Sequence, residues 1–193
     1  MATVTRKGRP IGVWAVSIAL GVAFGCMRAS PDRRRMADGS QWTAHNLDIK
    51  TFASYCYADD ERNCLKYGRL YTRESARRAC QMFGDGWRLP TEEEWRQLAK
   101  PYGGVHEDSA SNGAAAFNTL LTGGSSGFNA LLGGGRSQDG QYARLEAHGF
   151  YWTASECDSA SAWFYNFGHG SKALYRQSAG EKERAFSVRC IRE

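Results

Sequence analysis

The last third of the chain carries apolar residues at every second position. Trp163, Tyr165 and Phe167 share one parity, with Phe164 and Asn166 between them, and a similar alternation recurs from residue 186 to residue 190. Because successive side chains of a β-strand point to opposite faces, this period of two predicts strands in which about half of the aromatic residues are core. The expected strands span residues 150–155, 162–167, 173–177 and 186–191.

The middle of the chain carries a helical period instead. Thr72 is in position to cap a helix that runs to about residue 83, because apolar residues recur there at intervals of three and four. The inward face would hold Ala76, Ala79, Cys80 and Phe83, and the outward face Arg73, Arg77 and Arg78. A helix this short depends on packing for its stability.

A second helix is predicted to start with explicit capping chemistry. Thr91 follows a proline and is placed as an N-cap, and Glu94 three residues later completes a capping box. The helix would span residues 92–100, and Trp87, between the two helices, is expected to be their shared core. The inward residues of the second helix would be Trp95, Leu98 and Ala99.

Shorter segments complete the pattern. Before the first helix we expect a strand over residues 41–47, a polar loop between residues 56 and 64 and an extended segment over residues 67–71. Residues 105–140 are rich in glycine and predict loops around one short helix over residues 114–121. Helices in the middle and strands from both ends indicate an α+β domain.

The N-terminal residues have the layout of an export signal. A positive segment precedes an apolar stretch over residues 11–24, which is too short for a comfortable membrane span. Ala23-Phe24-Gly25-Cys26 resembles a bacterial lipobox in which Cys26 would be lipidated, and Met27 favours the outer membrane by resemblance to lipoprotein sorting rules. The alternative is an ordinary cleaved signal or a signal anchor. We therefore divide the chain into a signal peptide (1–25), a polar tether (26–39) and a domain (40–193).

The net charge is confined to the N-terminal part. Residues 1–39 hold seven basic and two acidic side chains, which accounts for the formal net charge of +5. Residues 40–193 hold 18 of the 25 basic and 18 of the 20 acidic side chains. A neutral domain provides no long-range positive field for a polyanion, so we expect no nucleic-acid partner.

Export makes disulfides chemically plausible for the cysteines after residue 26. Cys56 and Cys64 flank the polar loop and form the obvious local pair, and Cys80 with Cys190 would then tie the helical region to the last strand. Cys157 is left over. A zinc site is the competing use of these cysteines, but neither C-x2-C nor H-x3-H spacing is present, and we expect no metal.

The motifs do not favour catalysis. Gly123-Gly124-Ser125-Ser126-Gly127 matches the nucleophile elbow of hydrolases in its letters, but its flanks do not predict the required strand and helix. Residues 168–172 faintly resemble a phosphate loop and are better explained as a hairpin turn. The four histidines are scattered, the acidic residues 59–61 lack EF-hand spacing, and Glu92-Glu93-Glu94 is explained by helix capping. We therefore expect no enzyme activity and no cofactor.

One stretch is better explained by recognition than by packing alone. Between residues 156 and 183, aromatic and polar residues occur on short strands and their turns, and Arg176 lies among them. Tyr, Trp, Arg, Ser and Asn form adaptable recognition surfaces at low entropic cost. The alternative is that alternate aromatic residues are simply core. The candidate ligand-binding residues are Glu156, Asp158, Ser161, Trp163, Tyr165, Asn166, His169, Lys172, Tyr175 and Gln177.

Several ordered motifs from residue 41 to residue 193 resemble one family. They are Tyr67-Gly68-Arg69-Leu70-Tyr71, Cys80 followed by Gly86-Trp87-Arg88-Leu89-Pro90-Thr91 and Glu94-Trp95, Gly127-Phe128-Asn129-Ala130-Leu131, Tyr151-Trp152-Thr153-Ala154-Ser155-Glu156 and Phe186-Ser187-Val188-Arg189-Cys190. Together they are similar to the FISUMP domain (Fibrobacter succinogenes major paralogous domain). The resemblance implies a bacterial surface lipoprotein with a C-type-lectin-like fold, related to that of formylglycine-generating enzymes. In such a fold, two short helices pack on small twisted antiparallel sheets with long loops.

The resemblance also bears on chemistry. The family's short-loop and long-range cysteine pairs fit Cys56 with Cys64 and Cys80 with Cys190. The Glu-Pro-Asn and Trp-Asn-Asp motifs of calcium-dependent lectins are absent, and no free cysteine pair remains for the oxidase chemistry of the formylglycine enzymes. The same fold displays the variable surfaces of diversity-generating retroelements, and residues 156–184 resemble such a variable cassette.

We therefore expect a non-enzymatic, lipid-anchored protein of the bacterial cell envelope. Its C-terminal strands and turns would bind a protein or glycan ligand, and its N-terminal lipid would contact the membrane. The alternatives are a structural envelope lipoprotein without a specific ligand and a serine hydrolase that uses Ser125.

Overall fold

The computed structural model describes residues 1–3, 33–108 and 110–193. The expected signal peptide, the lipidated Cys26 and the first part of the tether therefore lie outside the described residues, apart from residues 1–3. Among the described residues, no helix has the length and apolar character needed to cross a membrane.

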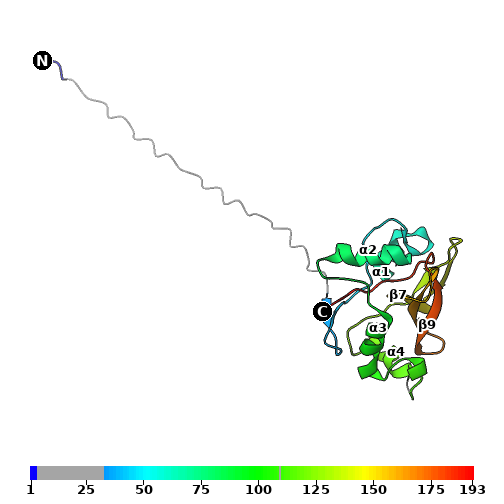
Figure 1. The fold of residues 1–193 in the computed structure, drawn as a ribbon. Helices are drawn as coiled ribbons and strands as arrows, with labels where there is room; N and C mark the ends of the chain where they lie inside the picture. Colours follow the sequence, from blue (N-terminus) through cyan, green and yellow to red (C-terminus); the bar gives the residue numbers. More distant parts are fainter. Residues whose placement is uncertain (4–32, 109) are drawn as a thin grey trace.

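A five-stranded sheet is the largest element (Figure 1). Its strands lie in the order β6, β5, β7, β8, β9, and neighbours are antiparallel except for the parallel pair β5 and β7. In the central register, Tyr151 lies opposite Tyr165, which lies opposite Arg176. Strands β7, β8 and β9 confirm three predicted strands. The bounds are β5 Gly133–Arg136, β6 Tyr142–Leu145, β7 His148–Glu156, β8 Ser161–Gly168 and β9 Ala173–Glu181.

Two small sheets bring distant parts of the chain together. Strand β2 (Gln41–Thr43) pairs with both β1 (Arg33–Arg35) and β10 (Ile191–Arg192), and β3 (Ser54–Tyr55) pairs with β4 (Leu70–Tyr71). Strand β1 falls within the part of the chain that we assigned to the tether. Because β1 and β10 share one partner, the two ends of the described domain lie in the same sheet (Figure 1).

Four α-helices lie around the sheets within the described residues, with α1 and α2 toward one end and α3 and α4 toward the other (Figure 1). Helices and several sheets confirm the α+β fold class. The helices are α1 Glu61–Tyr67, α2 Arg73–Phe83, α3 Glu92–Ala99 and α4 Ala114–Leu120. Three short 3-10 helices are η1 Tyr57–Asp59, η2 Lys100–Tyr102 and η3 His106–Asp108.

Both faces of the five-stranded sheet are covered. Tyr165 and Phe167 of β8 pack in a cluster with Trp95 of α3, whereas Phe164 packs on the other face in a cluster with Trp152. The second cluster also takes in α2 and the Cys80–Cys190 disulfide. The expectation that alternate aromatic residues supply the core is therefore wrong for β8, where both faces are buried. Burial on two faces makes the sheet a rigid support for the residues at its margins.

Both predicted disulfides are present. Cys56 and Cys64 are separated by 8 residues, and Cys80 and Cys190 by 110. The long-range bond joins the end of α2 to the residue that precedes β10, in the second core cluster. Cys157 is exposed and unpaired.

Helix α2 follows the prediction except at its first residue. Thr72 occupies the N-cap position, although its side chain makes no capping hydrogen bond. Arg73 was expected to face outward but is buried, with its Nε donating to the carbonyl of Thr153 at 3.1 Å. Its guanidinium also lies 3.6 Å from Glu156. Arg73 thus joins the helix to β7, because its apolar methylene chain can be buried while its guanidinium contacts acceptors on that strand.

Four further expectations were wrong. The polar loop between Cys56 and Cys64 contains the start of α1, whose N-cap Asp60 accepts a hydrogen bond from the backbone of Arg62. The glycine run at residues 133–135 belongs to β5 rather than to a loop. Residues 186–190 make isolated bridges, such as Tyr71 with Phe186, instead of a continuous strand. Trp87 packs with α2, while α3 packs in the other cluster, so it is not their shared core.

Arg189 is a fully buried cation that contacts Thr43 and Asn46 near the N-terminal end of the domain. Its guanidinium donates to the Asn46 Oδ1 at 2.9 Å, to the Thr43 carbonyl at 2.7 Å and to the Asn129 carbonyl at 2.6 Å. The same group lies 4.5 Å from the centre of the Phe128 ring. Burial lowers the pKa of Arg189 to about 10, so the side chain remains charged at neutral pH and depends on these acceptors.

The predicted capping box at the start of α3 is present. The Thr91 hydroxyl accepts from the Glu94 backbone at 3.2 Å, and the Glu94 carboxylate accepts from the Thr91 backbone at 2.7 Å. Arg88 donates two further hydrogen bonds to the same carboxylate, at 2.8 and 2.6 Å. Burial by itself would raise the pKa of Glu94, but the hydrogen bonds from Arg88 and Thr91 together hold it below its ordinary value of 4.5.

Replacing Glu94 with alanine is expected to lower the free energy of unfolding by about 1 kcal/mol at pH 7. Since the folded-state pKa is depressed, the ionic part of this stabilisation is present above the unfolded-state pKa and is lost as pH falls through the folded-state value. Urea unfolding at pH 7 and at pH 3 measures both effects. Glu94→Gln keeps a capping side chain without the charge, so it should reduce the pH dependence by the part that Glu94 contributes while retaining part of the stability. An unchanged pH dependence in Glu94→Gln would contradict this account.

Candidate ligand-binding surface

Glu92, the first residue of α3, connects the helix to three strands of the large sheet. Its backbone nitrogen donates to Ser155 Oγ at 3.0 Å, and its carbonyl accepts from the Tyr165 hydroxyl at 2.8 Å. Its carboxylate accepts from Arg176 at 2.7 Å. The hydrogen bond from Arg176 to Glu92 raises the pKa of Arg176 above its ordinary value. The helix terminus therefore holds Arg176 of β9 in one position.

Trp163 lies beneath that arginine and is partly exposed. The guanidinium carbon of Arg176 is 4.9 Å from the centre of the Trp163 ring, which is within the range of a cation–π contact. The backbone of Trp163 is also held, because its carbonyl accepts from the Thr153 hydroxyl at 2.7 Å. We call Trp163, Arg176 and Glu92 the tryptophan platform. It presents an aromatic ring and charged groups whose positions are already determined before any ligand binds.

A polar cleft of about 580 Å³ lies beside α3. It is lined by α3 and by residues that follow it, such as Val105 and Asp108. Arg96 donates across the cleft to Asp108 at 2.8 Å and along α3 to Glu93 at 3.0 Å. The buried Tyr165, whose hydroxyl donates to the Glu92 carbonyl, lies near both the cleft and the platform. Burial raises the pKa of Tyr165, and the charges of Glu92, Arg176, Arg96 and Asp108 all act on it. Glu93 lines the cleft and directly follows Glu92 of the platform in α3, so the cleft lies beside the platform.

The predicted binding residues fall into different environments. Tyr165 is fully buried, and Asn166 and Ser161 are also buried. Asn166 contacts His148 through Oδ1 and Nδ1 at 2.9 Å. Trp163, Tyr175 and Gln177 are partly exposed, and Tyr175 packs on His106 of η3 with ring centres 4.7 Å apart. Of the ten residues, only Trp163 belongs to the tryptophan platform. Tyr175 packs against η3, which borders the polar cleft.

The other predicted residues lie in or next to the turns at opposite ends of β8. At one end, Asp158 accepts from the backbones of Ala160 and Ser161 at 2.7 and 2.8 Å, and Glu156 lies 3.2 Å from Lys182. At the other end, His169 and Lys172 are exposed in the turn before β9. An antiparallel hairpin pair separates these turns by the length of the strand, so they do not converge on one site.

Several residues of the platform and the cleft, among them Arg176, Glu92, Arg96 and Asp108, were not among the ten predicted binding residues. Glu92, Arg96 and Asp108 appear in the sequence as parts of a helix start, a helix surface and a loop. Glu92 was interpreted as a favourable charge at a helix N-terminus, which accounts for an acidic residue without any partner. Its pairing with a residue 84 positions away has no local sequence signal.

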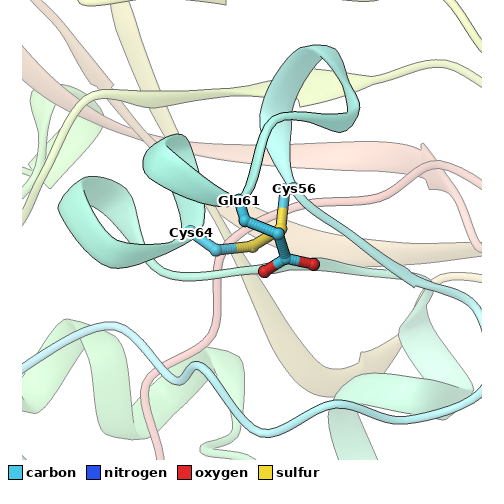
Figure 2. A group of neighbouring side chains, drawn as sticks. All are labelled: Cys56, Glu61 and Cys64. Atoms are coloured by element: carbon cyan, nitrogen blue, oxygen red, sulfur yellow. A yellow bond between two sulfur atoms is a disulfide. The ribbon is translucent and has the colours of Figure 1, made fainter.

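One group of side chains has the spacing of a metal site but different chemistry. Cys56, Glu61 and Cys64 lie within 4.8 Å of one another, and Figure 2 shows that the two sulfur atoms form a disulfide beside the Glu61 carboxylate. Thiolate ligands are needed for zinc, and a disulfide does not supply them. Arg69 lies 3.1 Å from both sulfur atoms and 3.6 Å from Glu61, so a cation already occupies this position.

The other candidate chemistry has structural partners. Residues 122–127 form turns between α4 and the following segment, and Ser126 Oγ donates to the Thr119 carbonyl at 2.7 Å. A strand-to-helix elbow is therefore not formed around Ser125. In the acidic residues 59–61, Asp59 accepts from the Tyr142 hydroxyl at 2.6 Å and Asp60 caps α1.

Comparison with known proteins gives one match. The sequence profile of a family described as the Fibrobacter succinogenes major domain matches residues 27–192. This range includes every helix and strand of the described domain. No curated protein and no solved structure matched the chain.

Proposed function

Because the chain belongs to the Fibrobacter succinogenes major domain family, which indicates a surface-associated protein, we propose that it is a non-enzymatic glycan-binding module of the bacterial cell envelope. The tryptophan platform supports this proposal most directly. A partly exposed indole held at 4.9 Å by Arg176 can stack on the apolar face of a sugar ring, while Glu92 and the polar cleft supply hydrogen-bond partners for hydroxyl groups.

Rigidity is the second support for binding at this surface. Trp163 and Arg176 lie on neighbouring strands of a sheet buried on both faces, and Glu92 is held by three separate hydrogen bonds. A preorganised surface loses less conformational entropy when a ligand binds.

Replacing Trp163 with alanine is expected to weaken glycan binding about tenfold or more, which corresponds to the loss of one stacking contact. A screen of immobilised glycans with the domain from residue 33 onward and with the full chain would identify the ligand, and titration would give the dissociation constants. Phe52→Ala is the matched control, because Phe52 is an aromatic residue that is 92% exposed and belongs to no core cluster.

Two outcomes would reject the glycan proposal. One is a screen in which no glycan binds the wild-type protein. The other is glycan binding that Trp163→Ala and Phe52→Ala weaken equally. If only protein ligands bind, and Trp163→Ala abolishes their binding, the platform is a protein-recognition surface instead.

We further propose that a lipid on Cys26 anchors the domain at the outer membrane. The export signal and lipobox-like residues support this proposal. Labelled palmitate that is still incorporated by a Cys26→Ser protein would refute it.

Sequence diversification of residues 156–184 remains part of the proposal. The buried residues Tyr165, Phe167 and Leu174 restrict such variation to the remaining, more exposed positions. If neither a reverse transcriptase gene nor an adenine-biased near-repeat of this coding segment lies nearby, diversification is refuted.

A further inference from the structure

A second pocket lies on the opposite face of the five-stranded sheet from Trp163. It has a volume of about 260 Å³ and is lined by β5, β6, β7, β8 and residues 184–186. Its floor is formed by Phe150, Phe164 and Phe186, whose ring centres are 5.1 to 6.1 Å apart. Phe164 follows Trp163 on the same strand, so the two side chains point to opposite faces. The pocket is therefore separate from the tryptophan platform.

The rim of this pocket is cationic. Arg136, Arg144 and Arg184 line it, and no carboxylate belongs to the lining. Arg184 is paired with Glu181. Among the described residues, no carboxylate lies within ion-pair distance of Arg136 or Arg144. The nearby Asp139 is engaged by the Ser137 hydroxyl and by the Gln141 backbone at 3.2 Å.

Arg136 is held in place with part of its hydrogen-bonding capacity unused. Its guanidinium carbon lies 4.1 Å from the ring centre of Tyr55 and 5.7 Å from that of Tyr142. Its backbone exchanges two hydrogen bonds with Ala185, at 2.9 and 2.8 Å. Its Nε is buried and has no hydrogen-bond partner among the described residues. Arg136 lines the pocket and has no carboxylate within ion-pair distance among the described residues, so it is suited to receive a carboxylate from a ligand.

Arg144 reaches the rim from an unusual backbone conformation. Its φ of 69° places a residue with a side chain in the left-handed region, which is uncommon outside glycine and asparagine. The turn that holds it is closed by a hydrogen bond from the Ala147 nitrogen to the Arg144 carbonyl at 3.1 Å. Strained residues of this kind cluster at ligand sites, where the surrounding structure imposes them.

From this pocket we infer a binding site for a small aromatic carboxylate, a class of ligand that the glycan proposal does not include. The volume is below the usual range of about 300 to 1,000 Å³ for drug-sized ligands, so it fits a single ring. A phenyl ring would pack on the three phenylalanines, and the carboxylate would accept hydrogen bonds from Arg136 and Arg144. A sugar ring is disfavoured because the floor offers its hydroxyl groups no hydrogen-bond partners.

The test uses 3-phenylpropionate as the probe and the full chain. Calorimetric titration is expected to show binding at about millimolar affinity, as for an efficient ligand of this size. Three related compounds should each bind at least about tenfold more weakly than 3-phenylpropionate. 3-Phenylpropionamide lacks the negative charge, propionate lacks the ring, and glucuronate has a polar ring in place of the phenyl ring. Added salt should weaken binding of the carboxylate more than that of the amide.

Two variants locate the site. Arg144→Gln should weaken 3-phenylpropionate binding about tenfold, while Arg192→Gln, at an exposed arginine outside the pocket lining, should leave it unchanged. Gly135→Ala should also weaken binding, because a Cβ there would lie 3.1 Å from Phe186 and 3.2 Å from Phe150 and would narrow the floor. Circular dichroism confirms that each variant folds.

The proposal is overturned if the wild-type protein binds neither the carboxylate nor its amide. It is also overturned if the amide binds as tightly as the carboxylate, or if Arg144→Gln binds as well as Arg192→Gln. Because Trp163 is not part of this pocket, Trp163→Ala should retain the carboxylate affinity. The two proposed sites can therefore fail independently.

Discussion

Replacing Cys80 and Cys190 together with alanine is expected to lower the free energy of unfolding by about 4 to 5 kcal/mol. The disulfide closes a loop of 110 residues, so its loss restores much conformational freedom to the unfolded chain. Both cysteines are also fully buried in the second core cluster, where removal of two sulfur atoms leaves unfilled space. Small domains often have no larger margin of stability than this.

The Cys56–Cys64 disulfide provides the matched control. Its sequence separation is only 8, so the same chain-entropy argument gives a loss of about 2 to 3 kcal/mol for the double alanine variant. Urea unfolding followed by tryptophan fluorescence measures both variants under identical conditions. Equal losses for the two pairs would show that loop closure does not govern their contributions.

Replacing Arg189 with methionine is expected to cost about 3 to 5 kcal/mol, because it leaves buried acceptors without a donor. The Asn46 side chain and the carbonyls of Thr43 and Asn129 each lose a hydrogen bond of 2.6 to 2.9 Å. Arg189→Lys is expected to cost nearly as much, since one ammonium group cannot reach all three acceptors that the planar guanidinium contacts.

Thermal and urea unfolding of the Arg189 variants test this expectation, with Arg192→Met as the control. Arg192 is exposed in β10, and its replacement should change stability by less than about 0.5 kcal/mol. If Arg189→Met were as stable as the wild-type protein, the buried cation would be replaceable by apolar packing and its hydrogen bonds would contribute no net stability.

The sequence predicts those parts of the fold that depend on neighbouring residues. The capping box of Thr91 and Glu94 is determined within four positions, and strand β8 follows from local alternation. Helix α1 was missed because it is short, polar and without an apolar period, and Asp60 was interpreted as part of an acidic loop. Strand β5 was missed because three glycines predict a loop unless a partner strand is known.

The contacts at the binding surface could not be predicted, because they join residues that are far apart in the sequence. Trp163 was identified because an aromatic residue on a strand is a recognisable candidate, but nothing local shows that Arg176 lies over it. Tyr165 was placed among the binding residues because alternation gives two faces without showing that both are covered. The cationic pocket was missed for the same reason, since its floor and rim come from five separate segments.

Residues 188–191 complete both core clusters of the domain, so the domain cannot finish folding before they have been synthesised. Val188 and Cys190 complete one core cluster and Ile191 the other, while Arg189 binds residues near position 45. A chain is synthesised from its N-terminus, so the domain remains unfinished until residue 191 has been made. If the protein is exported as we propose, this delay would keep the polypeptide unfolded until it has crossed the membrane, where its disulfides can form.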